Sequence, residues 1–207
     1  MKHLKHISIS ITLLLLCAVG LSQIERIDSL KKALRALKDS ARIDCLNELS
    51  EEYMGSPHCF NLAPARTTTQ IDTAEILALQ SIEEAEKINY IQGVAEAITL
   101  KAALAFNRYN NYSEAGNLAR EAIRLYAKTS NKKRLNRAYY ELGIALYAQS
   151  YFQAAINNLN TSYDLSKKTG DSIYVLSSVH TSAYVYMDCG DYKNAFEKAL
   201  HIRELLL

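Results

Sequence analysis

The stretch GDYKNAFEKA, Gly190 to Ala199, lies near the C-terminal end of the 207-residue sequence and sets the register of a repeat. Within it, Tyr192 is followed three positions later by Ala195. The same pair of an aromatic residue and an alanine recurs at intervals of 40 residues, at Phe152 with Ala155 and at Tyr112 with Ala115. A fixed interval of this length indicates a tandem array of structural repeats.

Two further markers keep the same interval. A small residue stands nine positions before each aromatic residue, and a large apolar residue follows the small one three positions later. The small residues are Ala103, Gly143 and Ala183, and the large ones are Phe106, Leu146 and Tyr186. An earlier copy is found at Leu49, Ser50 and Tyr53, with its matching alanine at Ala74. About 13 extra residues separate the halves of this first copy, and they fall in the stretch that carries both prolines of the chain, Pro57 and Pro64.

Each repeat has the pattern of two packed helices. Outside the proline-bearing stretch the chain is rich in Ala, Leu, Glu and Lys, which favour helices. Tyr139, Leu142, Gly143 and Leu146 recur at helical spacing and form one buried face. Small residues at matched positions in both halves allow two antiparallel helices to approach closely. The sequence therefore predicts an all-α chain of about four helical hairpins.

Short polar segments separate the expected helices. Asn111 and Asp191 stand where a side chain caps the start of the second helix of a unit. Gly170 stands where a helix ends.

The repeat resembles the tetratricopeptide repeat (TPR). The most similar stretches are ELGIALYAQSYFQAAINNL, residues 141–159, and AYVYMDCGDYKNAFEKAL, residues 183–200, and the resemblance covers about residues 40–207. The family's usual period is shorter, which implies helices about one turn longer here, and its helix-ending proline is absent from every unit. The resemblance implies a right-handed α-α superhelix, a TPR-like solenoid in which each unit packs against its neighbours.

The first residues have the pattern of a secretory signal peptide. Lys2 and Lys5 precede an apolar run from Ile7 to Val19, and small residues follow it, with cleavage expected after Ser22. The alternative is a membrane anchor, although the run is shorter than the roughly 20 residues that a spanning helix needs. Lipid attachment at Cys17 is disfavoured because Leu16, a large residue, precedes it. We therefore expect an exported protein, periplasmic or extracellular, with no membrane span beyond residues 1–22.

The expected organisation follows from the repeat register. The signal peptide covers residues 1–22, and a capping helix, IERIDSLKKALRALK, lies within residues 23–39. The array covers residues 40–207, with units at about 40–89, 90–131, 132–171 and 172–207 and an irregular insertion at 55–71 in the first unit. The last unit has no expected cap. We therefore expect either that a partner or a second copy of the chain covers its open face, or that the sequence is part of a longer chain.

Composition excludes several classes of function. Without Lys2 and Lys5 the chain has 22 basic and 22 acidic residues, which gives no reason to expect nucleic acid or an anionic membrane as a partner. The cysteines outside the signal peptide are Cys45, Cys59 and Cys189, an odd number; they are interpreted as small apolar residues, with a Cys45–Cys59 bridge as the alternative.

Catalytic and cofactor motifs are missing from the sequence. It contains no HExxH, no GxSxG, no glycine-rich phosphate loop and no cysteine pairs at zinc spacing. His58 and Cys59 could supply two metal ligands, but the pair is interpreted as part of a loop. We therefore expect no enzyme, no cofactor and no metal.

The resemblance implies that the first helix of each unit lines a concave groove that binds a peptide or a protein. Transferred to this register, the groove positions are Asn47 and Glu51 in the first unit, Leu100, Leu104 and Arg108 in the second, Arg137, Tyr140, Ile144 and Tyr147 in the third, and His180, Tyr184 and Met187 in the fourth. Their apolar centre, flanked by arginines, suits a peptide with an aliphatic side chain and a carboxylate. The alternative is that Tyr140 and Tyr184 pack between neighbouring units.

Two functions are consistent with these observations. The first is an exported scaffold that binds proteins or peptides in the groove. Binding of the acidic tails of heat-shock chaperones is disfavoured, because Glu51 and Leu104 occupy positions where that subclass carries Lys or Asn. The second function is suggested by resemblance to the exported sensory region of TPR-containing sensor histidine kinases, in which a membrane span and a kinase follow the array.

Overall fold

The computed structural model describes residues 23–55, 67–129 and 134–207, so the expected signal peptide and the residues from Pro57 to Pro64 lie outside the described part. A helix over residues 23–34 comes first. The helices that follow are α2 (Asp39–Met54), α3 (Thr68–Lys87), α4 (Ile91–Asn107), α5 (Tyr112–Tyr126), α6 (Leu135–Ala148), α7 (Phe152–Thr169), α8 (Ser172–Asp188) and α9 (Tyr192–Leu205).

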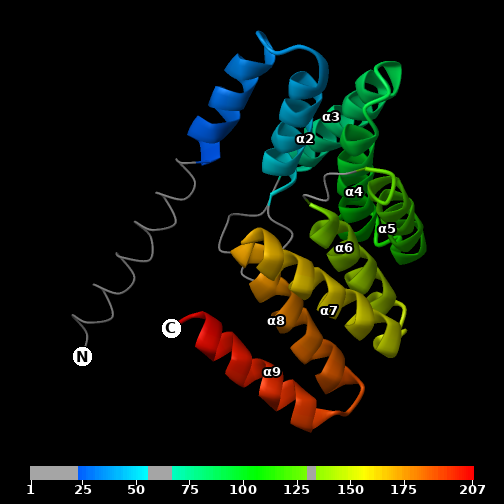
Figure 1. The fold of residues 1–207 in the computed structure, drawn as a ribbon, viewed down its shortest axis with the longest axis vertical. Helices are drawn as coiled ribbons and strands as arrows, with labels where there is room; N and C mark the ends of the chain where they lie inside the picture. The colour runs from blue at the N-terminus through cyan, green and yellow to red at the C-terminus, as the bar shows by residue number, and fades with distance from the viewer. Residues whose placement is uncertain (1–22, 56–66, 130–133) are drawn as a thin grey trace, which may run out of the picture.

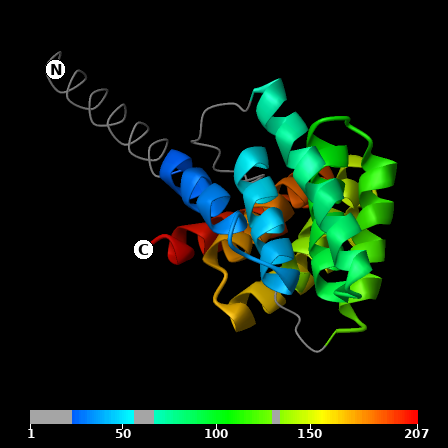
Figure 2. The same cartoon turned by 90° about the horizontal axis from the view of Figure 1, so that it is seen from above.

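These helices form four consecutive hairpins, α2/α3, α4/α5, α6/α7 and α8/α9, which stack into a curved array (Figure 1). The first helices of neighbouring hairpins pack against each other, as α2 on α4, α4 on α6 and α6 on α8, whereas the described second helices do not. The array therefore curves with the first helices on its concave side. Seen from above, the N-terminal helix, α2 and α3 lie in front of the last two hairpins (Figure 2). The expected fold class, an all-α TPR-like array, is confirmed.

Small residues bring the two helices of a hairpin together. Gly143 of α6 lies so close to α7 that an added Cβ would be 2.8 Å from Cγ of Leu159. Ala155 of α7 is fully buried and belongs to the same core cluster as Leu142, Leu146 and Leu159. The repeated small residues of the sequence are thus the positions of closest helix approach, and the large ones fill the space beside them.

Polar side chains cap the helices at the expected positions. The side chain of Asn111 accepts a hydrogen bond from the backbone N–H of Glu114 at the start of α5. Asp191 does the same for α9, accepting from the N–H of Asn194. Gly170 ends α7 with a φ of 72°, a left-handed conformation that glycine adopts without strain.

One boundary differs from expectation. α3 begins at Thr68, so the last residues of the irregular insertion expected at 55–71 are helical. The reason is local, because Thr67 and Gln70 form a capping box: Gln70 N–H donates to the Thr67 hydroxyl, and Thr67 N–H donates to Gln70 Oε1.

The two ends of the array differ in how they are covered. Ile27 of the helix over residues 23–34 is buried in a cluster with Leu46, Leu49 and Leu77, so this helix covers one side of α2. At the other end, α9 exposes Tyr192 and Phe196. Among the helices of the described ranges, none is both long enough and apolar enough to cross a membrane.

Candidate protein-binding site on the concave side

Half of the expected groove residues are buried in the structure. Neighbouring first helices pack so closely that these side chains lie between helices: the Asn47 side chain donates to the carbonyl of Gly93 on α4, and the rings of Tyr140 and Tyr174 meet edge to face with centroids 5.4 Å apart. The buried residues are Asn47, Leu100, Leu104, Arg137, Tyr140 and Ile144. Their side chains are mostly part of the core, and of these six Arg137 also lines the pocket described below.

The other expected residues do not form one surface. Arg108 pairs with Asp72 and Glu75 of α3, away from the remaining first helices. Tyr147 is half-buried and donates its hydroxyl proton to the Asp188 carboxylate at 2.5 Å. The residues of α8 lie at the end of the array, where Tyr184 and Met187 are exposed and the His180 ring packs edge-on against Tyr184.

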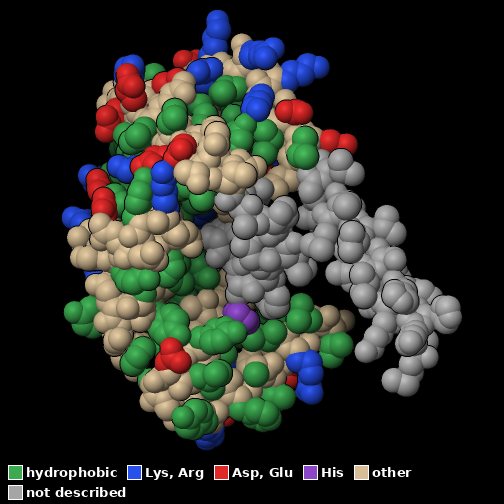
Figure 3. Space-filling view, turned by 180° about the vertical axis from the view of Figure 1, so that it is seen from behind, with side chains coloured by type: hydrophobic (Ala, Val, Ile, Leu, Met, Phe, Trp, Pro, Cys, Tyr) green, Lys and Arg blue, Asp and Glu red, His purple; other side chains and the backbone are tan. Residues whose placement is uncertain are grey.

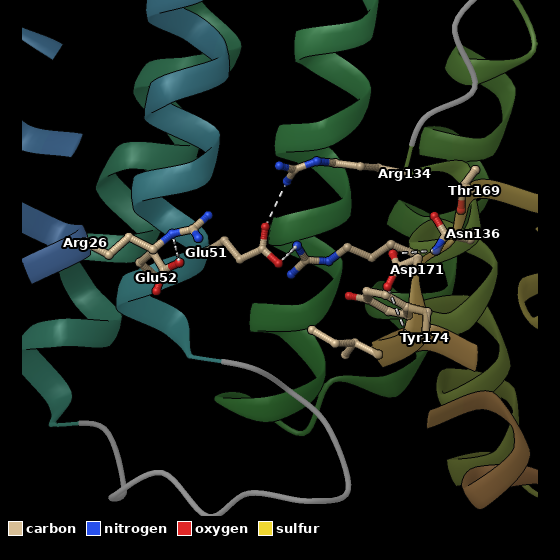
Figure 4. Close-up of a pocket in the computed structure, with 10 residues that line it drawn as sticks. Arg26, Glu51, Glu52, Arg134, Asn136, Thr169, Asp171 and Tyr174 are labelled. Atoms are coloured by element: carbon tan, nitrogen blue, oxygen red, sulfur yellow. Dashed lines mark hydrogen bonds and ion pairs between the residues drawn. The ribbon is translucent and has the colours of Figure 1, made fainter. Parts of the chain in front are cut away.

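A pocket of about 420 Å³ opens elsewhere on the concave side. It lies between the N-terminal helix, α2, the start of α6, and the junction of α7 and α8 (Figure 4). Its walls thus come from segments that are far apart in the sequence. The lining residues include Arg26, Glu51, Glu52, Arg134, Asn136, Arg137, Thr169, Asp171, Ile173 and Tyr174.

Glu51 of α2 is the centre of the pocket's charge network. One carboxylate oxygen accepts from Arg134 Nη1 at 2.8 Å and the other pairs with Arg137 Nη1 at 2.8 Å (Figure 4). Arg134 immediately precedes α6 and has a φ of 70°, which is unfavourable for a residue with a side chain. Helices α2 and α6 do not pack against each other in the described structure. The ion pairs of Glu51 with Arg134 and Arg137 are therefore a direct contact between α2 and the start of α6.

Arg137 is a buried guanidinium with unused donors. Its Nε and Nη2 make no hydrogen bond in the described part of the chain, although the group lines the pocket. Burial on its own would lower the pKa of Arg137, but the carboxylates of Glu51 and Glu141 raise it overall, so the group is charged. Both nitrogens are shielded from solvent and Nε faces Glu141, so a ligand in the pocket does not reach them in this structure.

Glu141 lies one turn along α6 from Arg137, with its Oε1 at 4.0 Å from Arg137 Nε. Its side chain is fully buried and neither oxygen accepts a hydrogen bond in the described residues. Burial raises the pKa of Glu141 to about 7, and the opposite charge of Arg137 limits the rise.

Asp171 closes the pocket at the start of α8. Its carboxylate accepts from the Asn136 side chain at 3.0 Å and from the backbone N–H of Tyr174 at 3.2 Å, so it caps α8 and holds the loop against α6. Asn136 also donates to the Ser166 hydroxyl at 2.9 Å.

Sequence reasoning identified two pocket residues, Glu51 and Arg137, and missed the rest. Arg134 and Asp171 lie in the segments between units, where the repeat pattern carries no information. A signal was present in α6, where Glu141 stands four positions after the groove position Arg137, a spacing that brings two opposite charges together on a helix.

The lining of the pocket presents charged and polar groups suited to recognition. Arginines, carboxylates and an amide line it, with no cysteine, serine or histidine among the lining residues named above. In the described ranges no cluster of three or more His, Cys, Asp or Glu side chains could hold a metal ion. The arrangement can bind the polar groups of a ligand and pack an apolar group against Ile173, which is 58% exposed.

Solved structures share this fold. Two crystal structures of nearly identical TPR-like repeats from a Podosopora anserina protein described as a kinesin light chain are 20% and 19% identical to this chain, with TM-scores of 0.56 and 0.54. Each match covers 90% of this chain and 87% or 88% of the other. No protein-family model and no curated protein matches the sequence. The chain is therefore similar in fold to TPR-like repeat proteins.

Proposed function

We propose that this protein is a non-catalytic scaffold that binds a segment of another protein in the concave pocket. The observation that carries the proposal is the pocket itself, which is lined by two accessible arginines, Arg26 and Arg134, with side chains 60% and 25% exposed, and by the exposed Ile173. A ligand oxygen can accept from such an arginine, and a hydrogen bond from a charged donor is stronger than one from a neutral donor.

The charge balance of the pocket limits the chemical class of ligand that it can bind. Three arginines line it, and so do the carboxylates of Glu51, Glu52 and Asp171. Because positive charge is not in excess, a neutral main-chain carbonyl suits the accessible arginines better than a carboxylate does. The proposed ligand is thus an extended peptide segment that offers a carbonyl to Arg26 or Arg134 and an aliphatic side chain to Ile173. The sequence alone predicted a peptide that carries a carboxylate.

Peptide selection tests this proposal. Peptides are selected from a phage-displayed random library on the immobilised protein, and fluorescein-labelled synthetic copies are titrated by fluorescence anisotropy. Ile173→Glu adds a charge beside the carboxylates of the pocket, and we expect it to weaken binding by about tenfold or more. Ile76→Glu is the matched control, because Ile76 is similarly exposed, at 64%, and does not line the pocket.

Weaker binding by Ile173→Glu, with the affinity of Ile76→Glu unchanged, supports the pocket as the peptide site. If no peptide is selected, or if both variants bind selected peptides as tightly as the wild type, the pocket is not a peptide site.

Export is the second part of the proposal, supported by the signal-peptide pattern of residues 1–22. The alternative is that the array is the exported sensory region of a TPR-bearing sensor histidine kinase or a related signalling protein, with the pocket as its input site. The two are separated by the mass of the native polypeptide in fractionated cells, detected with an antibody against the repeats. A band of about this chain's size outside the membrane fraction supports the free scaffold, and a much larger membrane-bound band supports the sensor.

A further inference from the structure

One carboxylate of the pocket lining differs from the others in its partners. Glu51 and Glu52 both form ion pairs with arginines of the lining. The Asp171 carboxylate lines the same pocket but forms no ion pair with any residue that the structure describes. Its negative charge is therefore the one in the lining that a ligand can still neutralise.

The arginines of the pocket have more acidic neighbours than they can neutralise. Arg134 has a carboxylate oxygen of Glu48 at 3.6 Å in addition to Glu51 at 2.8 Å. Acidic and basic side chains also intermingle over the end of the molecule that the N-terminal helix, α2 and α3 form (Figure 3). Within the described residues three positive charges thus meet four negative ones, and one negative charge is left over. The seven residues are Arg26, Arg134, Arg137, Glu48, Glu51, Glu52 and Asp171.

The Asp171 carboxylate is held in place before any ligand binds. One oxygen accepts from the backbone N–H of Tyr174 at 3.2 Å, and the other accepts from the Asn136 side chain at 3.0 Å. Asn136 is itself bonded to the Ser166 hydroxyl, and Figure 4 places Asp171 on the other side of the pocket from Arg26. Both donors are neutral groups, so the carboxylate keeps its charge. A preorganised carboxylate binds a cation without first losing side-chain entropy.

Ile173 adds apolar surface to the same wall of the pocket. It stands two residues after Asp171 in the first turn of α8, lines the same pocket and is 58% exposed. Lysine and arginine have a stem of methylene groups that covers apolar surface and a cationic end. A basic side chain therefore matches Ile173 and Asp171 together, whereas an aliphatic side chain matches only Ile173.

We propose that Asp171 selects peptide segments with a basic side chain, whose stem packs on Ile173 and whose cationic end donates hydrogen bonds to the Asp171 carboxylate. This inference rests on the proposed function and adds to it the class of side chain that the pocket recognises. Asp171 is thus a specificity-determining residue of the pocket.

Paired peptides that differ in one side chain test this inference. The two members of a pair carry either lysine or norleucine among uncharged residues, and both have an acetylated N-terminus, an amidated C-terminus and an uncharged dye. Norleucine has the methylene stem of lysine without the ammonium group. A series of such pairs is titrated with the full 207-residue chain by fluorescence anisotropy. We expect the lysine peptide to bind about tenfold more tightly than its norleucine partner.

Substitution of Asp171 assigns the preference to this carboxylate. Asp171→Asn removes the charge but keeps an oxygen that can accept from the Tyr174 N–H, and we expect it to abolish the preference for lysine. Asp171→Ser is a second uncharged variant, because serine also caps helices. The matched control is Asp191→Asn, the same substitution at the residue that caps α9 outside the pocket lining, and it should keep the wild-type preference. Circular dichroism verifies that each variant is folded.

Equal affinity of the lysine and norleucine peptides for the wild type overturns the inference. A lysine preference that the Asp171 variants retain, or that the control variant also loses, overturns it as well. The proposed function is judged separately with the norleucine peptides, because the new carboxylate of Ile173→Glu would itself attract lysine. If Ile173→Glu weakens their binding, the pocket is a peptide site whatever the role of Asp171. If no peptide of either kind binds, the inference and the proposed function are both wrong.

Discussion

Glu141 and Arg137 are charged residues on a face of α6 that is otherwise part of the core. Arg137 is anchored by Glu51, but Glu141 forms an ion pair only with Arg137 among the described residues, at 4.0 Å, and accepts no hydrogen bond there. Burying a carboxylate in this way favours its protonated form, which is why its pKa is raised from 4.5 to about 7.

The raised pKa makes stability depend on pH. Below pH 4.5 Glu141 is protonated in both the folded and the unfolded chain. As pH rises towards 7, the unfolded chain releases the proton first, so the free energy of unfolding falls, and the loss is complete above the folded pKa. Glu141→Gln lacks this titration. We expect the variant to gain stability relative to the wild type between about pH 5 and about pH 8, by up to roughly 3 kcal/mol.

Urea unfolding of both proteins at several pH values measures this difference, in which the titration of all other groups cancels. Parallel stability profiles for the two proteins would show that Glu141 is not buried as a carboxyl group of raised pKa.

At the scale of helices, the approach of α6 and α7 is limited by Gly143. An added Cβ there would lie 2.8 Å from Leu159 Cγ and 2.9 Å from Cδ2, and Leu159 is fully buried. Gly116 in α5 provides the comparison, because its added Cβ would meet Arg120 Nη1 at 3.5 Å and Ala145 Cβ at 3.7 Å, which are ordinary contacts.

Alanine substitution at the two glycines is therefore expected to have opposite effects. Gly143→Ala should lower the free energy of unfolding by about 1–3 kcal/mol through overpacking. Gly116→Ala should raise it by up to about 1 kcal/mol, because alanine favours a helix interior more than glycine does. Chemical denaturation followed by circular dichroism provides both values, and a stabilising Gly143→Ala would contradict the close packing of these helices.

The helix boundaries show how far sequence could predict the elements. The capping positions Asn111, Gly170 and Asp191 are where the pattern placed them, because capping is a local interaction. The irregular insertion was predicted to extend to residue 71, whereas α3 begins at Thr68. The prolines dominated that prediction, and the capping box of Thr67 and Gln70 was not recognised.

Across the whole molecule, Glu51 couples units that are not neighbours. In a simple repeat array each unit contacts only the next. Here Glu51 of the first unit binds Arg134, 83 residues later, at the start of the third. We infer that this pair contributes to the curvature of the concave side.

A double-mutant cycle of Glu51→Gln and Arg134→Gln measures the coupling. We expect about 0.5–3 kcal/mol, because the pair is partly shielded from water and shares Arg137. The control cycle uses Arg26→Gln and Glu52→Gln, whose ion pair involves an arginine side chain that is 60% exposed; we expect less than about 1 kcal/mol there. Urea unfolding of the variants provides the values, and an equally small coupling in both cycles would exclude a structural role for Glu51 across units.

The sequence by itself determined the all-α hairpins and their 40-residue register, because the spacing of small and large residues encodes which faces of consecutive helices meet. Only the tertiary structure decided which first-helix residues are accessible. Tyr140 and Ile144 are buried, whereas Tyr184, in the position of Ile144 one unit later, is exposed, because exposure depends on whether a neighbouring helix covers the position. The pocket was equally beyond the sequence, since Glu51, Arg134 and Asp171 meet only through the curvature of the stacked units.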